Sequence, residues 1–246
     1  MSAQRTTINL LDVEPELAEG LNPQERAAAA RVLAVPTEAL EPGPWDPHAA
    51  LADVYPVVGF LLVDGMVTRD LVFAGRTTTE LLGAGDMLRP WDDDVAFDAL
   101  PFSASWNVHT PARVAILDTR VAIASGRWPS IATALHARHV RRVRGLAFQR
   151  AIAQLPRVDD RMLVLLWALA ERWGIVARDG VRVPVGLPHR TLATLVGARR
   201  PSVTTALTGL AREGLVERTA DGWLLHGDPE EVLRRRLQGA NQAMSR

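Results

Sequence analysis

Residues 187–227 contain two short helical patterns that are joined by a glycine and followed by a hairpin pattern. In the first pattern, apolar residues recur at i, i+3 and i+4, which places one apolar stripe along a helix that starts near Pro188. Gly197 ends this helix, because glycine tolerates the left-handed backbone of a tight turn between helices. The residues of the stripe are Leu192, Leu195 and Val196.

A second helical pattern starts near Pro201, where proline removes no intrahelical hydrogen bond. Its apolar residues are spaced by four and three, so we expect them to face the interior and the hydroxyl residues between them to face outward. Two guanidinium groups, those of Arg199 and Arg200, stand at the amino end of the outward face. The expected inward residues are Val203, Leu207 and Leu210, and the expected outward residues are Ser202, Thr205 and Thr208.

A hairpin pattern comes next. Gly214 closes the second helix, and residues 215–218 alternate apolar and polar side chains. Asp221-Gly222 is the signature of a two-residue turn, and it precedes the apolar run 223–225. The order of two helices and a hairpin is that of a winged helix-turn-helix.

A winged helix-turn-helix inserts its second helix into the major groove, where arginine reads guanine while hydroxyls and backbone amides hold phosphate. The hairpin would lie along the phosphates, with Arg218 as its contact. The alternative is a pair of packing helices with a solvated arginine pair. The predicted DNA-binding residues are His189, Arg190, Arg199, Arg200, Ser202, Thr204, Thr205 and Arg218.

This segment resembles a known family, the Crp/Fnr superfamily of bacterial transcription regulators. The first helix reads L-A-T-L-V-G, and the second reads A-R-R-P-S-V-T-T-A-L where the family has S-R-x-T/S-V-x-R-x-L, with L-A-R-E-G-L-V after it. The resemblance implies base and phosphate contacts at Arg200, Ser202 and Thr205. Pro201 stands where many members keep a Glu that reads cytosine, and Thr205 replaces a frequent Arg. The operator half-site therefore need not be the usual one.

Short β-like runs with turn signals between them begin near Val54. Turns are expected at Asp64-Gly65, Ala74-Gly75 and 83–86, and the spacing predicts an antiparallel sandwich or roll. This agrees with the sensory domain of the family, a β-roll of the cyclic-nucleotide-binding type. The expected strands are Val57 to Val63, Met66 to Phe73, Thr77 to Leu82, Phe102 to His109 and Arg113 to Leu117.

The remaining segments complete an α+β organisation. A small helix is expected over Pro23 to Leu33, and the proline-rich run Glu41 to Pro47 is expected to be a loop or a wrapped arm rather than a core element. Helices are expected from Pro129 to Leu155 and from Asp159 to Trp173. The expected domains are 1–50, an arm with a small helix; 51–127, the β-roll; 128–156, a dimerisation helix; and 157–246, the winged helix-turn-helix.

In the family, the long helix lies along its twin in a homodimer. The apolar seam of this helix is Ile131, Leu135, Val140, Val143 and Leu146, which is not a clean heptad. A single reading helix is too short to be selective, which favours a dimer on a near-palindromic site. Residues 138–144 are expected to be a solvated helix face, with DNA contact as the alternative.

The formal charge is zero, with 28 basic and 28 acidic residues, but it is unevenly distributed. Residues 1–125 hold 8 Arg and 18 acids, whereas residues 126–246 hold 20 Arg and 10 acids. The basic half is the half that contains the helix-turn-helix, as DNA binding requires. The chain has no cysteine, which excludes disulfides and thiolate-bound metal clusters. It has no apolar run long enough for a membrane span and no signal-like start, so a cytoplasmic location is expected.

The β-roll is not expected to bind cyclic AMP or cyclic GMP in the usual way. The resemblance places Phe102 where a phosphate-binding Arg would stand, and Arg89 and Pro90 replace the usual Gly-Glu pair. An unpaired phosphate buried against an aromatic ring is unfavourable by several kcal/mol. The candidate pocket residues for another effector are Arg89, Trp91, Phe102 and Trp106, with Phe97 nearby in sequence, and the alternative is that these aromatic residues form the core of the roll.

The sequence also contains candidate ligands for haem and for a metal ion. His48 and His109 would be the axial ligands of a haem, but they lack a spacing motif and are more simply ordinary polar residues. Asp92-Asp93-Asp94 favours a solvated acidic loop over a metal site, because adjacent carboxylates point in different directions. We predict no metal and no cofactor, and the identity of any effector stays open.

The leading interpretation is a homodimeric DNA-binding transcription regulator in which the roll is either a sensor or a scaffold. The resemblance adds RNA polymerase as a candidate partner. One alternative is a regulator that senses another small molecule or haem in the roll. Another is a winged-helix module that binds protein. No nucleophile, phosphate loop or metal-ligand motif with a supporting context is present, so an enzyme is not expected.

Overall fold

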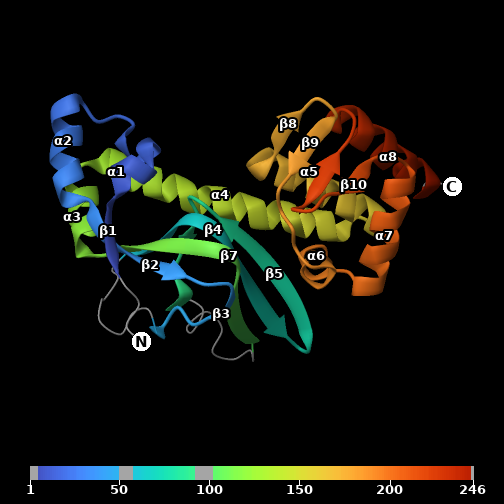
Figure 1. Cartoon of the computed structure of the whole chain (residues 1–246), viewed down its shortest axis with the longest axis horizontal. Helices are drawn as coiled ribbons and strands as arrows, with labels where there is room; N and C mark the ends of the chain where they lie inside the picture. The colour runs from blue at the N-terminus through green and yellow to red at the C-terminus, as the bar shows by residue number, and fades with distance from the viewer. Residues whose placement is uncertain (1–4, 50–57, 92–101, 245–246) are drawn as a thin grey trace. The chain divides into compact units, whose positions relative to one another are not determined.

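The computed structural model describes residues 5–49, 58–91 and 102–244. The fold is α+β, as predicted, and it divides into two compact units, Met1–Gly145 and Leu146–Arg246 (Figure 1). The boundary between the units falls within the helix α4 (Pro129–Gln154). Within the described ranges, no helix is both long and apolar enough to cross a membrane.

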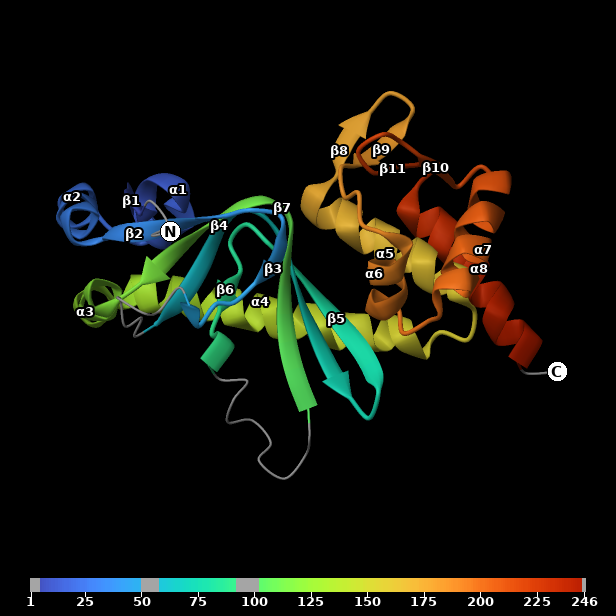
Figure 2. The ribbon, with the colours of Figure 1, turned by 60° about the horizontal axis from the view of Figure 1, so that its bottom comes forward.

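The first unit is built on an antiparallel sheet of seven strands. The strand order is β1-β2-β7-β4-β5, while β3 also pairs with β7 and β6 pairs with β4. The long strands β4, β5 and β7 lie side by side in Figure 2, as their pairing requires. The strands are β1 (Thr6–Asn9), β2 (Ala34–Leu40), β3 (Gly43–Trp45), β4 (Gly59–Phe73), β5 (Arg76–Gly83), β6 (Met87–Leu88) and β7 (Phe102–Leu117).

The turn expected at Asp64-Gly65 is wrong, because β4 runs through it without a break. The pairing of β4 with β7 shifts register between Leu62 and Val67, which marks an irregular, bulged segment. Gly65 has φ +84°, and a Cβ there would come within 2.4 Å of the Ala112 Cβ. Glycine therefore permits a close approach inside the sheet at this position, and it signals a bulge rather than a turn.

The small helix expected over Pro23 to Leu33 is present, but the expectation that the rest of residues 1–50 form an arm is wrong. The segment before β4 contains α1 (Leu10–Val13), a 3₁₀ turn (Pro15–Ala18) and α2 (Pro23–Val32), and three of its strands join the sheet. Elements of four residues are too short to show a periodicity in sequence, although their leucines are buried. The most deeply buried are Leu10, Leu11, Leu17, Leu33 and Val35.

Helices α3 (Thr119–Arg127) and α4 follow the sheet, and α3 was not predicted. The start of α4 packs into the same core as α1 and α2 through Ile131 and Leu135. The face expected to be solvated over residues 138–144 is partly buried, because the Arg138 side chain is 2% exposed and forms an ion pair with Glu14. A buried guanidinium of this kind requires a carboxylate partner, which sequence spacing alone does not reveal.

The second unit is helical, with one small antiparallel sheet of strand order β10-β11-β9-β8. The predicted helices and the last hairpin are confirmed, whereas β8, β9 and α8 were not predicted. The elements are α5 (Val158–Trp173), β8 (Ile175–Ala177), β9 (Gly180–Val183), α6 (His189–Leu195), α7 (Arg200–Arg212), β10 (Val216–Arg218), β11 (Trp223–Leu225) and α8 (Pro229–Met244).

Candidate nucleic-acid interface

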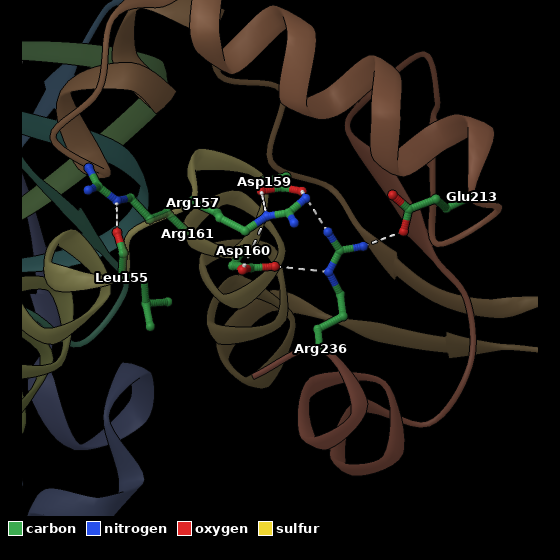
Figure 3. A network of polar contacts seen from close by, with 7 residues as sticks. All are labelled: Leu155, Arg157, Asp159, Asp160, Arg161, Glu213 and Arg236. Carbon is green, nitrogen blue, oxygen red and sulfur yellow. Dashed lines mark hydrogen bonds and ion pairs between the residues drawn. The ribbon is translucent and has the colours of Figure 1, made fainter. Parts of the chain in front are cut away.

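Helices α6 and α7 pack through the apolar residues that the sequence pattern assigned to their inner faces. The turn between them is held by backbone and side-chain bonds: the Ala198 amide donates to the Ala193 carbonyl at 2.9 Å. The Arg161 guanidinium of α5 donates to the carbonyls of Val196 and Gly197 at 3.3 and 3.2 Å. Arg161 also donates to the Leu155 carbonyl (Figure 3). The buried residues of the two inner faces include Leu192, Leu195, Val196, Val203, Leu207 and Leu210.

The outward face of α7 carries hydroxyl groups, as predicted. Ser202, Thr204, Thr205 and Thr208 are exposed. The hydroxyls of the three threonines donate to the carbonyls four residues earlier in the helix, at 2.9 to 3.2 Å. Their oxygen atoms keep lone pairs toward solvent, so this face can accept hydrogen bonds from amino groups on base edges.

His189, the first residue of α6, is joined to α7 by a hydrogen bond between its Nδ1 and the Thr204 Oγ1 at 3.0 Å. The Thr204 hydroxyl has one hydrogen, and when that hydrogen goes to the Arg200 carbonyl, Nδ1 is the donor in this bond. Nε2 of the neutral ring is then an acceptor. The imidazole also stacks on Trp223, with ring centres 6.4 Å apart and planes inclined by 25°.

The ring of Trp223 contacts two of the predicted DNA-binding residues, His189 and Arg218. Trp223 begins β11 and is 3% exposed, with His189 on its ring and the Arg218 Cζ 4.7 Å from the ring centre. Arg218 is itself exposed on β10, directly opposite Trp223 in the hairpin. The indole therefore fixes both the imidazole and the guanidinium on one side of the wing.

Three of the predicted residues act on one another electrostatically. Burial lowers the pKa of His189, and the positive charges of Arg218 and Arg200 lower it further. Helix α7, the hairpin β10–β11 and the start of α6 thus bring two permanent cations and an imidazole close together. A phosphate group is the kind of ligand that would relieve this concentration of positive charge.

The wing turn lies one residue earlier than predicted. The Thr219 amide donates to the Gly222 carbonyl at 3.0 Å, so Ala220 and Asp221 form the corner. A Cβ at Gly222 would come within 2.0 Å of the Val183 carbonyl oxygen. Gly222 therefore serves a close approach to β9, a contact between distant segments that a turn signature cannot show.

The structure brings His189 and Arg218 together on the indole of Trp223, with Thr204 bonded to His189 and Arg200 close enough to lower the pKa of His189. Arg190, Arg199 and Ser202 are exposed on the same two helices, and Thr205 lies exposed on α7. Neither Trp223 nor Arg161 was predicted to belong to this surface. The position of Trp223 at the start of the last hairpin strand could have indicated its role. The contact of Arg161 with a turn 35 residues away could not be inferred from the sequence.

Comparison with known families supports this reading of the geometry. A model of the Crp-like helix-turn-helix domain matches residues 160–234. The match covers the helix-turn-helix and the elements around it, so the carboxy-terminal unit of this chain is similar to the DNA-binding domain of Crp-like proteins. No curated protein matches it in sequence.

Solved Crp/Fnr structures share the fold over most of the chain. A mutant of CooA from Carboxydothermus hydrogenoformans is 17% identical with a TM-score of 0.61, covering 95% of this chain and 97% of that one. FixK2 from Bradyrhizobium japonicum is 14% identical with a TM-score of 0.58, covering 81% and 95%. The c-di-GMP responsive global regulator CLP of Xanthomonas campestris is 16% identical with a TM-score of 0.58, covering 82% and 100%.

Aromatic residues of the candidate effector pocket pack against one another in the core of the sheet domain. Trp106 is buried in the core of the roll, and Trp45 of β3 meets it edge to face at 5.8 Å. Phe60 meets Trp45 at 5.9 Å and Trp91 at 6.0 Å in the same geometry. Trp91 and Trp106 therefore belong to the core of the roll, which was the alternative to a pocket. Trp45 packs against the same core, so the expectation that residues 41–47 lie outside it is wrong for this residue.

The other two pocket residues are placed differently. The Arg89 guanidinium donates to the Val58 carbonyl at 3.0 Å and lies over Trp91, 5.3 Å from its ring centre. Phe102 stands at the start of β7, directly opposite Phe73 of β4. Phe102 therefore lies at the end of the β4–β7 ribbon, and its pairing partner Phe73 is 13 residues along β4 from Phe60, which belongs to the aromatic core.

The described residues do not support the candidate metal and haem sites. The His109 Nε2 is 2.9 Å from the Thr68 Oγ1, an ordinary structural hydrogen bond, and His48 is exposed. Among the described side chains, no group of three or more His, Asp or Glu is arranged to hold a metal ion. The expectation for Asp92-Asp93-Asp94, like that for Phe97, lies outside the described residues.

Proposed function

We propose that this chain is a sequence-specific DNA-binding transcription regulator that acts as a homodimer on a near-palindromic site. The observation that carries the proposal is the surface on which Arg200, Arg218 and His189 meet beside the hydroxyl face of α7. Guanidinium groups recognise guanine and phosphate, and the hydroxyl oxygens accept from base amino groups. In this proposal, residues 157–246 read DNA, with Arg190, Arg199, Ser202, Thr204 and Thr205 as further contacts.

The homodimer is supported by helix α4, which has 26 residues and keeps apolar side chains on its surface. Val143 is 64% exposed and Phe148 is 50% exposed. Apolar side chains of this size on a helix are favourable in contact with another apolar surface, and a second copy of the helix supplies one. We assign residues 128–156 as the dimerisation helix. Two reading helices about one turn of DNA apart would then make the site long enough to be selective.

We further propose that cyclic AMP does not control the chain. Phe102 and Arg89-Pro90 stand where the phosphate and ribose contacts of a cyclic-nucleotide roll are expected. The bond of Arg89 to the Val58 carbonyl and the aromatic contacts of Trp91 support a roll, residues 51–127, that serves first as a scaffold. Calorimetric titration with cyclic AMP should give no binding heat, and a micromolar dissociation constant would contradict this part of the proposal.

The DNA proposal is tested by selection from a pool of random duplexes with the purified full-length protein. We expect enrichment of a near-palindromic sequence whose half-sites are about 10 base pairs apart. Affinity for the selected duplex should fall steeply between low and moderate salt, because arginine–phosphate contacts release counterions. A protein that enriches no sequence and shows no affinity for duplex DNA at low salt would instead be a protein-interaction module. Contact with RNA polymerase is a separate step of the proposal, tested by transcription from a promoter that carries the selected site.

A further inference from the structure

The guanidinium of Arg236 in α8 lies between three carboxylates from two other helices (Figure 3). Its Nε donates to the Asp160 Oδ1 at 2.9 Å, and its Nη2 donates to the Asp159 Oδ2 at 2.7 Å, both at the start of α5. Its Nη1 donates to Glu213, at the end of α7. One side chain therefore joins the start of α5, the end of the recognition helix and the helix that follows the wing.

The contact with Asp160 is structurally necessary. The Asp160 side chain is 4% exposed, and a buried carboxylate without a cation is strongly unfavourable. Arg157 is the other cation near it, but at 3.8 Å, and Arg157 donates directly to Asp159 at 2.6 to 3.1 Å. The Asp159–Asp160–Arg236 group thus anchors α8 to α5.

The contact of Arg236 with Glu213, unlike that with Asp160, is not required by burial. Glu213 is the C-cap residue of α7, and its side chain is 49% exposed, so water could solvate it without a partner. Burial therefore does not require this bond, and what the bond does is restrain the end of α7. Since α7 has 13 residues, its two ends lie about 18 Å apart, and a small tilt at Glu213 displaces Arg200 by ångströms.

We propose that Arg236 is a positioning residue for DNA reading. Through Glu213 it fixes the tilt of the recognition helix, so that Arg200 at the other end meets its base in a defined geometry. Helix α8, which extends beyond the matched domain 160–234, is then part of the reading machinery. This inference rests on the proposed DNA-binding function.

The test uses Glu213→Gln, which leaves Arg236 in place for Asp159 and Asp160. Removing a negative charge from a DNA-binding domain should by itself strengthen DNA binding. A loss of affinity in Glu213→Gln would therefore come from the lost restraint on α7 and not from the change in charge. We expect affinity for a selected duplex of about 30 base pairs to fall about fivefold, with the melting temperature shifted by no more than about 4 °C. Affinity for a scrambled duplex should stay the same or rise.

Glu217→Gln is the matched control. Glu217 is an exposed carboxylate on β10, 67% exposed, and its replacement makes the same charge change without touching α7. It should leave affinity unchanged or increase it. An equal gain in affinity from Glu213→Gln and Glu217→Gln would overturn the inference while leaving the DNA-binding function intact.

A double-mutant cycle identifies Arg236 as the partner. Arg236→Lys keeps the positive charge beside Asp159 and Asp160, but a single ammonium cannot reach three carboxylates in different directions. In this background, Glu213→Gln should cause no further loss of affinity for the selected duplex. Additive losses would show that Glu213 does not act through Arg236. A wild-type protein that selects no duplex would contradict the proposed function itself, a distinct outcome.

Discussion

Arg142 of α4 holds both carboxylate oxygens of Glu80 in β5, with its Nε 2.6 Å from Oε1 and its Nη2 2.8 Å from Oε2. Its Nη1 donates to the Met87 carbonyl at 3.1 Å. The side chains are 17% and 8% exposed, and Arg69 adds a second cation 3.3 Å from Glu80. This fork is a polar link between the helix proposed to dimerise and the sheet.

Arg142→Met should therefore destabilise the protein strongly. It leaves the carboxylate of Glu80 largely buried with Arg69 as a poorer partner, and removing one side of a buried pair typically lowers the free energy of unfolding by about 3–5 kcal/mol. Urea denaturation followed by circular dichroism measures the loss. The double replacement with Glu80→Leu should recover part of it, since neither charge is then left unpaired.

The control for this prediction is Arg113→Met. Arg113 pairs with Asp64 at 2.5 Å, but both side chains are nearly half exposed. Exposed pairs contribute about 0–1 kcal/mol, so this variant should be close to wild type. Equal losses from the two arginine variants would mean that burial does not set the strength of the Arg142–Glu80 pair.

Arg200→Ala should weaken binding to a selected duplex by about 1–3 kcal/mol if Arg200 reads a base. The matched control is Arg212→Ala, an exposed arginine in the last turn of the same helix. Fluorescence anisotropy with selected and scrambled duplexes separates the two roles. A base contact loses affinity for the selected duplex only, whereas a phosphate contact weakens both and lowers the salt slope by about one. Equal affinity of Arg200→Ala and wild type for every duplex would remove Arg200 from the interface.

The helix-turn-helix was predictable because its signals are local. Val203, Leu207 and Leu210 repeat at helical spacing within one short segment, and the structure buries all three. The turn at Ala74-Gly75 was predictable for the same reason: both residues have positive φ, as a tight two-residue hairpin requires. Local periodicity and turn chemistry depend only on neighbours in the chain.

The errors come from contacts between segments far apart in the chain. Gly65 and Gly222 resemble turn glycines in sequence, yet each lies where another backbone segment comes too close for a side chain. Arg138 appeared to belong to a solvated charge run, but Glu14, 124 residues away, pairs with it in the interior. The residues of the proposed DNA-binding surface were named from the sequence, whereas Trp223, on which His189 and Arg218 lie, was not, because ring contacts between distant segments are decided by the fold.

Val143→Glu should convert the proposed dimer into a monomer. Val143 lies exposed on α4, and a charge there would meet its own copy across a two-fold axis, adding repulsion to the loss of apolar contact. Sedimentation equilibrium measures the change in mass. Val176→Glu is the control, since Val176 is 85% exposed on β8, outside α4. A wild-type protein that sediments as a monomer at micromolar concentration would contradict the homodimer.

The pKa of His189 predicts a pH dependence with a defined sign. Burial, Arg218 and Arg200 hold this pKa below the ordinary value of 6.5. Between the folded pKa and 6.5, the unfolded chain binds the proton more readily than the folded chain does. The contribution of neutral His189 to stability is therefore complete above pH 6.5 and is lost as the pH falls through the folded pKa. In His189→Gln, the free energy of unfolding should lose this part of its pH dependence.

DNA should reverse the preference of His189 for its neutral form. Because Nδ1 donates to Thr204, Nε2 must take up a proton before it can donate to a phosphate, and the phosphate charge stabilises the imidazolium. Affinity for the selected duplex should then rise as the pH falls toward the folded pKa of His189, which lies below 6.5, by up to about tenfold per pH unit for one proton. His226→Gln is the control, since His226 contacts the Asp179 carbonyl away from α7. A pH slope that survives in His189→Gln but disappears in His226→Gln would mean that His226 takes up the proton. It would remove the phosphate contact from His189.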